Sequence, residues 1–276
     1  MGQDTDRAEQ GGVSSRVRTL LVTGAAGRVG TLLRPLLRER YRLVLLDRAP
    51  VTDRVPGESE LTGDLLDNDL LERAVAASDF VLHLACVHGF SITFEETLDA
   101  NYRATLALLD ATARAGGRRF IYASSHHVLG AHTLEGFAGD AAALAPDAYY
   151  GLSKAFGEAA CAMYAHRFGM KCLMIRIGNA DPEVGDGRTA RLWTSARDLA
   201  NLVAIGCEHP DIGCDIVYGV SQCEDALFSN TRATELGYTP LDHAKDNLSA
   251  GYAPATGDHA GGQYVTTKLV GPGRQT

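Results

Sequence analysis

Short apolar runs alternate with longer amphipathic stretches along most of the chain from Val17 onward. Thr19–Val22 and Leu43–Leu46 are apolar runs of strand length, and the stretch from Arg28 to about Glu39 between them has the period of a helix. A strand, a helix and a second strand in this order predict a βαβ unit, in which the two strands lie parallel.

The same alternation continues through the middle of the chain. The further elements that we predict are strands Phe80–Leu84, Arg119–Ala123 and Lys171–Ile177, with helices over Glu95–Ala115 and Tyr150–Phe168. Because strands and helices alternate, we expect an α/β protein: a Rossmann-type doubly wound parallel sheet with helices on both faces.

The alternation ends after Ile177. We expect a loop over Gly178–Thr189, followed by a helix over Ala196–Cys207, a strand over Asp215–Tyr218 and a helix over Asn230–Leu236. This part is interpreted as a small C-terminal substrate-binding lobe that caps a site on the sheet.

The ends of the chain lack an apolar period. The patterns divide the chain into a disordered tail over 1–16, a single domain over 17–247 (core 17–178, capping part 179–247) and a flexible or docked C-terminal arm over 248–276. Within the arm, Tyr264–Val270 is a candidate short strand or docked segment.

Composition and charge narrow the class of protein. The 276 residues are 45% hydrophobic, enough for one sizeable core, and the 26 basic residues against 34 acidic ones give a net charge of −8. The basic residues form no patch, so nucleic acid is not an expected partner. The chain lacks an apolar run of about 18 residues and a signal-peptide pattern at its start, so we expect neither a membrane partner nor export, but a cytoplasmic protein.

Six cysteines are present, and none forms a CxxC pair. Cys86 and Cys172 fall in segments that resemble buried strands. We therefore expect reduced, structural thiols rather than disulfides or a metal site.

The first predicted strand continues into a GxxGxxG loop, Thr23 to Gly30, that opens a helix. Gly24 permits the tight turn, Gly27 lets the backbone approach a pyrophosphate, and Gly30 allows close helix–strand packing. The helix start around Arg28 and Val29 supplies free N–H groups for phosphate. The loop is typical of a dinucleotide site, and the absence of a following Gly-Lys-Ser/Thr argues against a P-loop.

Asp47 at the end of the second predicted strand indicates NAD, because its carboxylate can bind ribose hydroxyls and repel a 2′-phosphate. Arg48 follows directly and would suit NADP, so dual use stays open. The remaining candidate cofactor-binding residues lie at strand ends or in the later helix: Asp64, Leu65, Leu84, Ala85, Lys154 and Ile177.

Tyr150 and Lys154 open a predicted helix one turn apart, and Ser125 ends a preceding strand. An ammonium close to a phenol favours the phenolate, so Tyr150 is the candidate base and Lys154 its activator. Ser125 would hydrogen-bond the reacting hydroxyl or carbonyl. Tyr149 is not an equivalent candidate, because its fourth successor is Ser153.

Over roughly 18–247 the chain resembles the extended short-chain dehydrogenase/reductases of the NAD-dependent epimerase/dehydratase superfamily, and within them the uronate dehydrogenases. The resemblance rests on TGAAGRVG, LLDRAP, HLAC, YASSHHVLG, YYGLSKAFGE and RIGNADPEVGDGR followed by Trp193. The chain is also similar to haloarchaeal-type glucose-6-phosphate dehydrogenases, which share the Arg-Ile-Gly-Asn pattern of 176–179.

The resemblance implies NAD-dependent oxidation of the anomeric hydroxyl of an acidic sugar to a lactone, with Arg188 holding the sugar carboxylate. It places substrate contacts at Ser125, His88, His126, His127 and Asn179, and the chain departs from the family at His126, at Asn179 and near His88. The family pattern after the serine is Asn-His, and serines stand at or near the positions of His88 and Asn179. A phosphate or sulfonate sugar is therefore an open alternative.

Other functions remain as alternatives. A nucleotide-sugar epimerase or dehydratase shares the serine, tyrosine and lysine but needs a larger C-terminal lobe, and a non-catalytic NAD(P)-binding sensor would lose those residues. We expect no metal at His126 and His127, because consecutive residues on an extended loop point apart. Related proteins pair through helices at about Glu95–Ala115 and Tyr150–Phe168, so a homodimer or higher homo-oligomer is expected.

Overall fold

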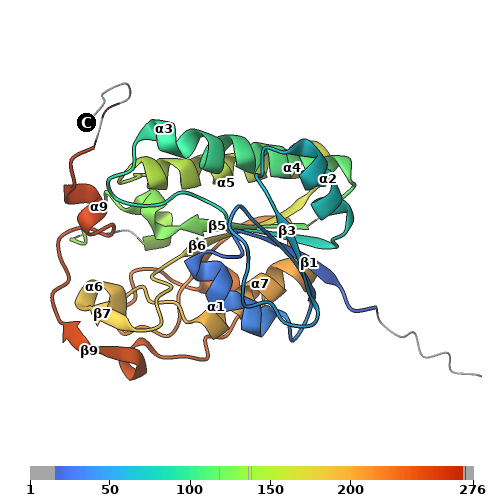
Figure 1. Ribbon diagram of the computed structural model, residues 1–276. Helices are drawn as coiled ribbons and strands as arrows, with labels where there is room; N and C mark the ends of the chain where they lie inside the picture. The colour runs from blue at the N-terminus through green and yellow to red at the C-terminus, as the bar shows by residue number, and fades with distance from the viewer. Residues whose placement is uncertain (1–15, 118, 136, 138, 270, 272–276) are drawn as a thin grey trace, which may run out of the picture.

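A seven-stranded parallel sheet forms the centre of the protein in the computed structural model, which describes residues 16–117, 119–135, 137, 139–269 and 271 (Figure 1). Its strands, in spatial order, are β3 (Glu58–Thr62), β2 (Arg42–Asp47), β1 (Thr19–Thr23), β4 (Phe80–His83), β5 (Arg119–Ser125), β6 (Lys171–Ile177) and β8 (Cys214–Gly219). All six pairings are parallel. The prediction of an α/β protein with a Rossmann-type sheet is confirmed.

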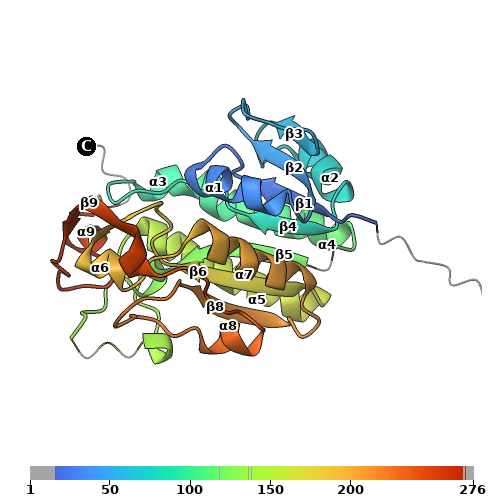
Figure 2. The ribbon, with the colours of Figure 1, turned by 90° about the horizontal axis from the view of Figure 1, so that it is seen from below.

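Helices cover both faces of the sheet, as Figure 2 shows. One face carries α1 (Arg28–Leu37) and α7 (Ala196–Glu208), and the other carries α2 (Asn68–Ala76), α4 (Ala104–Arg114) and α5 (Tyr149–Phe168). The alternation along a strand explains the two cores: Leu20 and Val22 of β1 enter one, and Leu21 enters the other, all fully buried.

The order of the strands creates a crevice beside β1. The chain leaves β1 toward β2 and β3 on one side and returns to β4 on the other, so Thr23 is paired with Leu46 in one direction and His83 in the other. At such a switch point the loops after the strands diverge, which leaves room for a ligand at the carboxyl ends.

The helix before β5 is interrupted. α3 (Phe94–Thr97) begins with a Thr93 capping box, continues as a π-helical turn, η1 (Leu98–Arg103), and then becomes α4. The helix predicted over Glu95–Ala115 is therefore right in extent, but the prediction did not include the π-turn. Such turns widen a helix by one residue and often occur at functional sites.

The segment Gly178–Thr189, predicted as a loop, contains β7 (Val184–Asp186) and the start of α6 (Gly187–Ala190), so that expectation was wrong. β7 pairs in parallel with β9 (Leu248–Ala253), far away in the sequence. Neither strand has a strong apolar alternation, so the pattern gave no signal for this small sheet.

The last described part of the chain runs along the carboxyl end of the main sheet, as the red segment in Figures 1 and 2 shows. After β9 it forms a bridge between His259 and Thr133, and then α9 (Gln263–Thr266). The expected docked segment is thus a helix instead of a strand in its described part. Val270 and residues 1–15 lie outside the described residues.

The remaining short elements are α8 (Thr231–Glu235) and the 3-10 turns η2 (His126–Leu129), η3 (Gly139–Ala141) and η4 (Ala244–Asn247). Among the described residues, no helix is both long and apolar enough to cross a membrane.

Candidate active site

A cavity of about 1080 Å³ opens at the carboxyl ends of β1, β4, β5 and β6. Every residue predicted to bind cofactor, bind substrate or act in catalysis lines it: Gly24, Gly27, Arg28, Val29, Gly30, Asp47, Arg48, Asp64, Leu65, Leu84, Ala85, His88, Ser125, His126, His127, Tyr150, Lys154, Ile177, Asn179 and Arg188. The structure thus brings all of the predicted residues together around one space.

The glycine loop between β1 and α1 fits a dinucleotide. Gly24 has φ +70°, and a Cβ on it would lie 2.6 Å from the amide nitrogen of Ala85, so only glycine allows β1 and the loop after β4 to meet here. A Cβ on Gly30 would lie 2.5 Å from the carbonyl oxygen of Gly24. The two glycines let α1 begin directly at the cavity, with its first amides available to a pyrophosphate.

Asp47 lies at the end of β2, on the far side of this loop. Its Oδ2 accepts a hydrogen bond from the amide of Ala26, and its Oδ1 accepts one from the amide of Ala49, each at 3.0 Å. The amides hold the carboxylate at the cavity, where it suits the diol of a ribose. Arg48 beside it is exposed and also lines the cavity.

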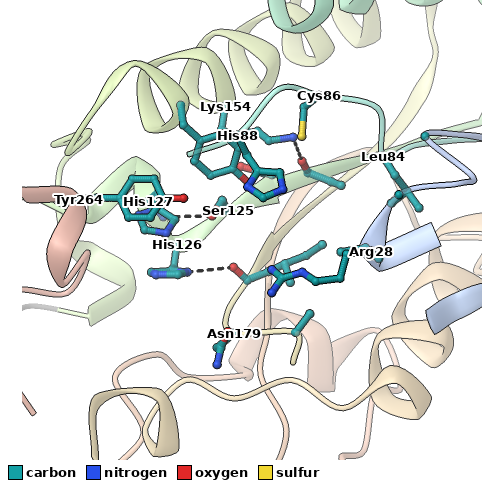
Figure 3. Close-up of a pocket in the computed structure, with 18 of the residues that line it drawn as sticks. Arg28, Leu84, Cys86, His88, Ser125, His126, His127, Lys154, Asn179 and Tyr264 are labelled. Carbon is teal, nitrogen blue, oxygen red and sulfur yellow. Dashed lines mark hydrogen bonds between the residues drawn. The ribbon is translucent and has the colours of Figure 1, made fainter. Parts of the chain in front are cut away.

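Ser125, Tyr150 and Lys154 form the catalytic end. Ser125 ends β5, and Tyr150 and Lys154 lie one turn apart at the start of α5. The buried Lys154 Nζ donates a hydrogen bond to the carbonyl oxygen of Ala123 at 2.7 Å and lies 5.6 Å from the centroid of the Tyr150 ring (Figure 3). The hydrogen bond fixes the ammonium close to the phenol, as a tyrosine base requires.

Burial raises the pKa of Tyr150 well above its ordinary value, and nearby Cys86 adds to this, whereas a hydrogen bond with Ser125 and the cation of Arg28 lower the pKa. In the protein as described, the phenol is therefore protonated at neutral pH. The expected effect of Lys154 on the phenolate is outweighed here by desolvation, which is the larger effect. Additional positive charge close to the ring is needed before Tyr150 can act as a base.

Asn101 is a site residue that the sequence analysis missed. It lies on the π-turn η1, its Nδ2 donates to the carbonyl oxygen of Val87 at 2.8 Å and to Ser153 Oγ at 2.9 Å, and its Oδ1 accepts from the amide of Val87 at 2.7 Å. These bonds tie the loop after β4 to α5. An asparagine inside a helical stretch was the available signal.

His126 and His127 follow Ser125 on the 3-10 turn η2, with ring centroids 4.1 Å apart. The expectation that the two side chains point apart on an extended loop was wrong, because the chain curls into a 3-10 turn directly after β5. Burial lowers the pKa of His126 well below its ordinary value and that of His127 to about 3. In the described part of the chain, no group of three metal-ligating side chains includes them.

Arg188, on α6, is half-buried and supplies the positive charge of this end. Its Nη1 donates to the carbonyl oxygen of Ala260 at 3.0 Å, and no carboxylate forms an ion pair with it among the described residues. Its cation lowers the pKa of both His126 and His127, which places the three side chains close together. A guanidinium without a counter-ion in a cavity suits an anionic ligand.

The other predicted substrate residues lie on different walls. The His88 ring lies 6.1 Å from that of Tyr150, centroid to centroid, and Asn179 is anchored by its backbone to Leu192 and Thr194 (Figure 3). Cys86, expected in a buried strand, instead follows β4, is half-buried and lines the cavity. Cys172 is buried in β6, as expected.

The C-terminal segment closes the cavity, and its individual residues were missed. The Tyr264 ring lies 4.0 Å from that of His127, and the amide of Gly261 donates to the carbonyl oxygen of Gly130 at 2.8 Å. These contacts join segments more than a hundred residues apart in the sequence. The glycine-rich composition of the segment gave no sign of which residues would face the site.

The glycine loop, Asp47 and the serine, tyrosine and lysine define a dinucleotide-dependent protein of the Rossmann class. The chain belongs to the NAD dependent epimerase/dehydratase family, whose model matches residues 20–181. The predicted resemblance, the NAD cofactor and the assignment as an NAD-dependent enzyme are thereby confirmed, and the relatives agree.

Uronate dehydrogenase of Pseudomonas syringae pv. tomato is 36% identical over 263 residues, which cover 91% of this chain and 94% of that protein. The NAD-dependent glucose-6-phosphate dehydrogenase of Haloferax volcanii is 30% identical, with 82% and 94% covered. The crystal structure of uronate dehydrogenase from Agrobacterium tumefaciens has a TM-score of 0.84 at 29% identity, covering 92% of this chain and 98% of that one.

Proposed function

We propose that the protein is an NAD-dependent dehydrogenase that oxidises the anomeric hydroxyl of a uronate to a lactone. The observation that carries this proposal is the guanidinium of Arg188, which faces the same cavity as Tyr150 and forms no ion pair among the described residues, although the charges of Asp186 and Asp147 act on it. The similarity to uronate dehydrogenases over most of the chain supports the same assignment.

We assign the two ends of the cavity to different ligands. The glycine loop, Asp47 and the strand ends at Leu65 and Ala85 would hold NAD, which accepts a hydride when bound. His88, His126, His127, Asn179 and Arg188 would hold the sugar.

We assign the removal of the hydroxyl proton to Tyr150 and the orientation of the anomeric hydroxyl to Ser125. Ser125 hydrogen-bonds the anomeric oxygen, and Tyr150 Oη takes the proton of that hydroxyl. Lys154 favours the phenolate against the effect of burial, since its ammonium is fixed beside the ring by the carbonyl oxygen of Ala123. Loss of a hydride from the anomeric carbon and of a proton from its hydroxyl converts the cyclic hemiacetal into a ring ester, so the first product is a lactone.

Arg188 would select the carboxylate. An arginine can hold a carboxylate through two parallel N–H···O bonds, and its Nη1 is already oriented by Ala260. A sugar phosphate would satisfy the same charge, so the choice between them is part of the test.

The test follows the fate of the sugar by ¹³C NMR, with glucuronate, galacturonate, glucose and glucose-6-phosphate each mixed with NAD and protein. We expect a lactone resonance to appear with a uronate and to decay into the open dicarboxylate. If glucose-6-phosphate is the only sugar that is oxidised, the substrate is a sugar phosphate and not a uronate. If a nucleotide sugar is epimerised without net NADH and no free sugar reacts, the proposal is wrong.

We also propose a homo-oligomer that works in the cytoplasm. α5 exposes the apolar side chains of Leu152, Met163 and Phe168, which a second copy could cover. Ala155 and Ala159 of the same helix are small enough for a second helix to approach closely. A mass of one chain, measured by light scattering at micromolar concentration, would contradict the proposed oligomer.

A further inference from the structure

Two imidazoles lie side by side on the substrate wall, and each has one nitrogen already engaged. His126 Nδ1 lies 3.2 Å from the carbonyl oxygen of Ile177 (Figure 3). A carbonyl oxygen only accepts hydrogen bonds, so this nitrogen carries the proton. Because burial and the Arg188 cation keep the ring neutral, Nε2 is left as a bare acceptor. It is buried and has no partner in the described part of the protein.

His127 is engaged in the same way, but by a carboxyl group. Its Nδ1 lies 2.5 Å from Oδ2 of Asp147, whose side chain is fully buried in the loop before α5. The backbone of two glycines encloses this carboxyl: a Cβ on Gly130 would lie 1.8 Å from Oδ2, and a Cβ on Gly261 would lie 2.1 Å from it. The carboxyl therefore cannot turn away, and His127 is held by Nδ1.

The position of the proton in this pair decides what His127 offers to a ligand. With Asp147 ionised, Nδ1 must donate, and Nε2 of the neutral ring is an acceptor. A second proton on the pair would convert Nε2 into a donor, whether it resides on the carboxyl or on the ring. The carboxyl of Asp147 thus determines whether Nε2, on the other side of the His127 ring, is an acceptor or a donor.

We propose that Asp147 is a positioning residue that keeps His127 in the Nδ1–H form, so that His127 presents an Nε2 acceptor to the substrate. The site is then complementary to an anionic sugar with a hydroxyl that donates a hydrogen bond to this nitrogen beside the group bound by Arg188. This deepens the proposed function and rests on it for the identity of the sugar.

The charges around the pair favour this state at mildly alkaline pH. Burial raises the pKa of Asp147 to about 7, and the cation of Arg188 opposes that increase. The titratable or charged groups that face His127 are Asp147, His126, His88, Arg188, Tyr150 and Tyr264. Burial, and after it the charges of Arg188 and His88, disfavour an imidazolium, so the ring stays neutral. At pH 8 the pair therefore holds a single proton, on Nδ1.

A direct test is imidazole ¹⁵N NMR of the uniformly labelled full chain at pH 8, with NAD added and with His126→Asn and His127→Asn used for assignment. We expect both rings to show a protonated Nδ1 and a bare Nε2. In Asp147→Asn the amide can donate to Nδ1, so the proton of His127 should move to Nε2 while His126 is unchanged. A wild-type His127 with its proton on Nε2, or no change in Asp147→Asn, would overturn the proposal.

Kinetics give a second readout, with uronates in which one ring hydroxyl is replaced by fluorine, a group that cannot donate. For the wild type we expect kcat/KM to fall by about 10-fold to 100-fold at the position that faces His127, as for a buried acceptor left without a donor. In Asp147→Asn this penalty should shrink below about 3-fold. Asp258→Asn, which changes an exposed carboxyl on the cavity rim, should keep the wild-type penalties.

The two readouts separate the possible failures. If the wild type oxidises no uronate, the proposed function fails, and the NMR experiment still decides the role of Asp147. If Asp147→Asn does not fold, as judged by its NAD affinity, the wild-type ¹⁵N spectrum alone confirms or excludes the Nδ1–H form. Fluorine penalties that are equal in wild type and Asp147→Asn would contradict the proposal even where the protein turns over.

Discussion

The two ends of the cavity are built in different ways. Most of the cofactor end comes from one stretch of chain, from Gly24 to Leu65, in which each contact follows directly after a strand. The substrate end is assembled from segments scattered between His88 and Tyr264. Local sequence therefore determines the proposed NAD site, whereas the proposed sugar site depends on how distant segments meet.

The chemistry of the two ends differs as well. At the cofactor end most of the groups offered to a ligand are backbone amides at the start of a helix, and two further amides orient the carboxylate of Asp47. At the substrate end buried titratable side chains lie in mutual contact, so a change in one alters the charge or the proton position of another. Variants at the two ends should consequently affect different ligands.

Replacing Tyr150 with Phe should have the largest effect. Loss of a positioned proton acceptor lowers kcat by roughly 10²–10⁴-fold, while NAD affinity, measured by calorimetry, stays within about 3-fold because the phenol is not part of the glycine loop. Tyr149→Phe is the matched control, since Tyr149 lies in the same turn and has no lysine four residues on. Equal loss in both variants would contradict the assignment.

Arg188→Gln should raise KM for a uronate by roughly 30-fold or more, because removing one partner of a desolvated charge pair costs at least about 2 kcal/mol. NAD affinity should not change. Arg191→Gln serves as control, because the nearby Arg191 donates to the carbonyl oxygen of Asp225 and does not line the cavity. A KM that rises equally for the neutral parent sugar would argue against a carboxylate contact.

Asp47→Asn tests the opposite end. We expect the dissociation constant of NAD to rise by roughly 10-fold, as for a lost hydrogen bond to a charged group. NADP should bind better relative to NAD, since the repulsion of its 2′-phosphate is removed. The uronate KM at saturating NAD is the control, and a change in it as large as that in NAD affinity would contradict the separation of the two ends.

His83, buried at the end of β4 and not part of the cavity lining, should give the smallest effect. Its Nδ1 lies 2.7 Å from Thr23 Oγ1, its Nε2 lies 3.0 Å from Thr105 Oγ1, and burial lowers its pKa to about 3. The unfolded chain binds the extra proton below the ordinary value of 6.5, so stability rises with pH between about 3 and 6.5 and is lost as pH falls through this window.

Each buried histidine of this kind contributes up to about 1.4 kcal/mol per pH unit. Urea unfolding between pH 5 and 7 should therefore show a shallower pH dependence in His83→Gln than in wild type. The exposed His166→Gln provides the comparison and should leave the slope unchanged. The same slope in His83→Gln and wild type would mean that His83 is charged in the folded protein.

The same contrast between local and long-range contacts explains what the sequence could predict. Strand and helix periods, the glycine loop and the tyrosine–lysine spacing are local, and they predicted the positions of Asp47 and Tyr150 and the five central strands of the main sheet, but they gave no residue range for β3, and they assigned β8 to the capping lobe instead of the sheet. The glycine at position 24 can also be explained from its own backbone, because its positive φ is one that residues with a side chain rarely adopt without strain. The resemblance to a known family added Arg188 and the two histidines.

What the sequence could not show depends on contacts between distant segments. β9 finds β7 without an apolar alternation of its own, and Tyr264 reaches His127 from the end of the chain. Asp147 follows a proline in an alanine-rich loop, and nothing in that loop indicates that it faces a histidine twenty residues earlier. The π-turn around Asn101 changes only the phase of a helix, which a periodicity search does not detect.

The most direct test of the proposed activity is the initial rate of NADH formation at 340 nm with glucuronate, galacturonate, glucose and glucose-6-phosphate, each at saturating NAD and at pH 8. We expect kcat/KM for a uronate to exceed that for glucose by at least roughly 30-fold, the value of one charge-assisted contact at Arg188. Equal rates with glucose, or no NADH from any of these sugars by a protein that binds NAD, would contradict the account.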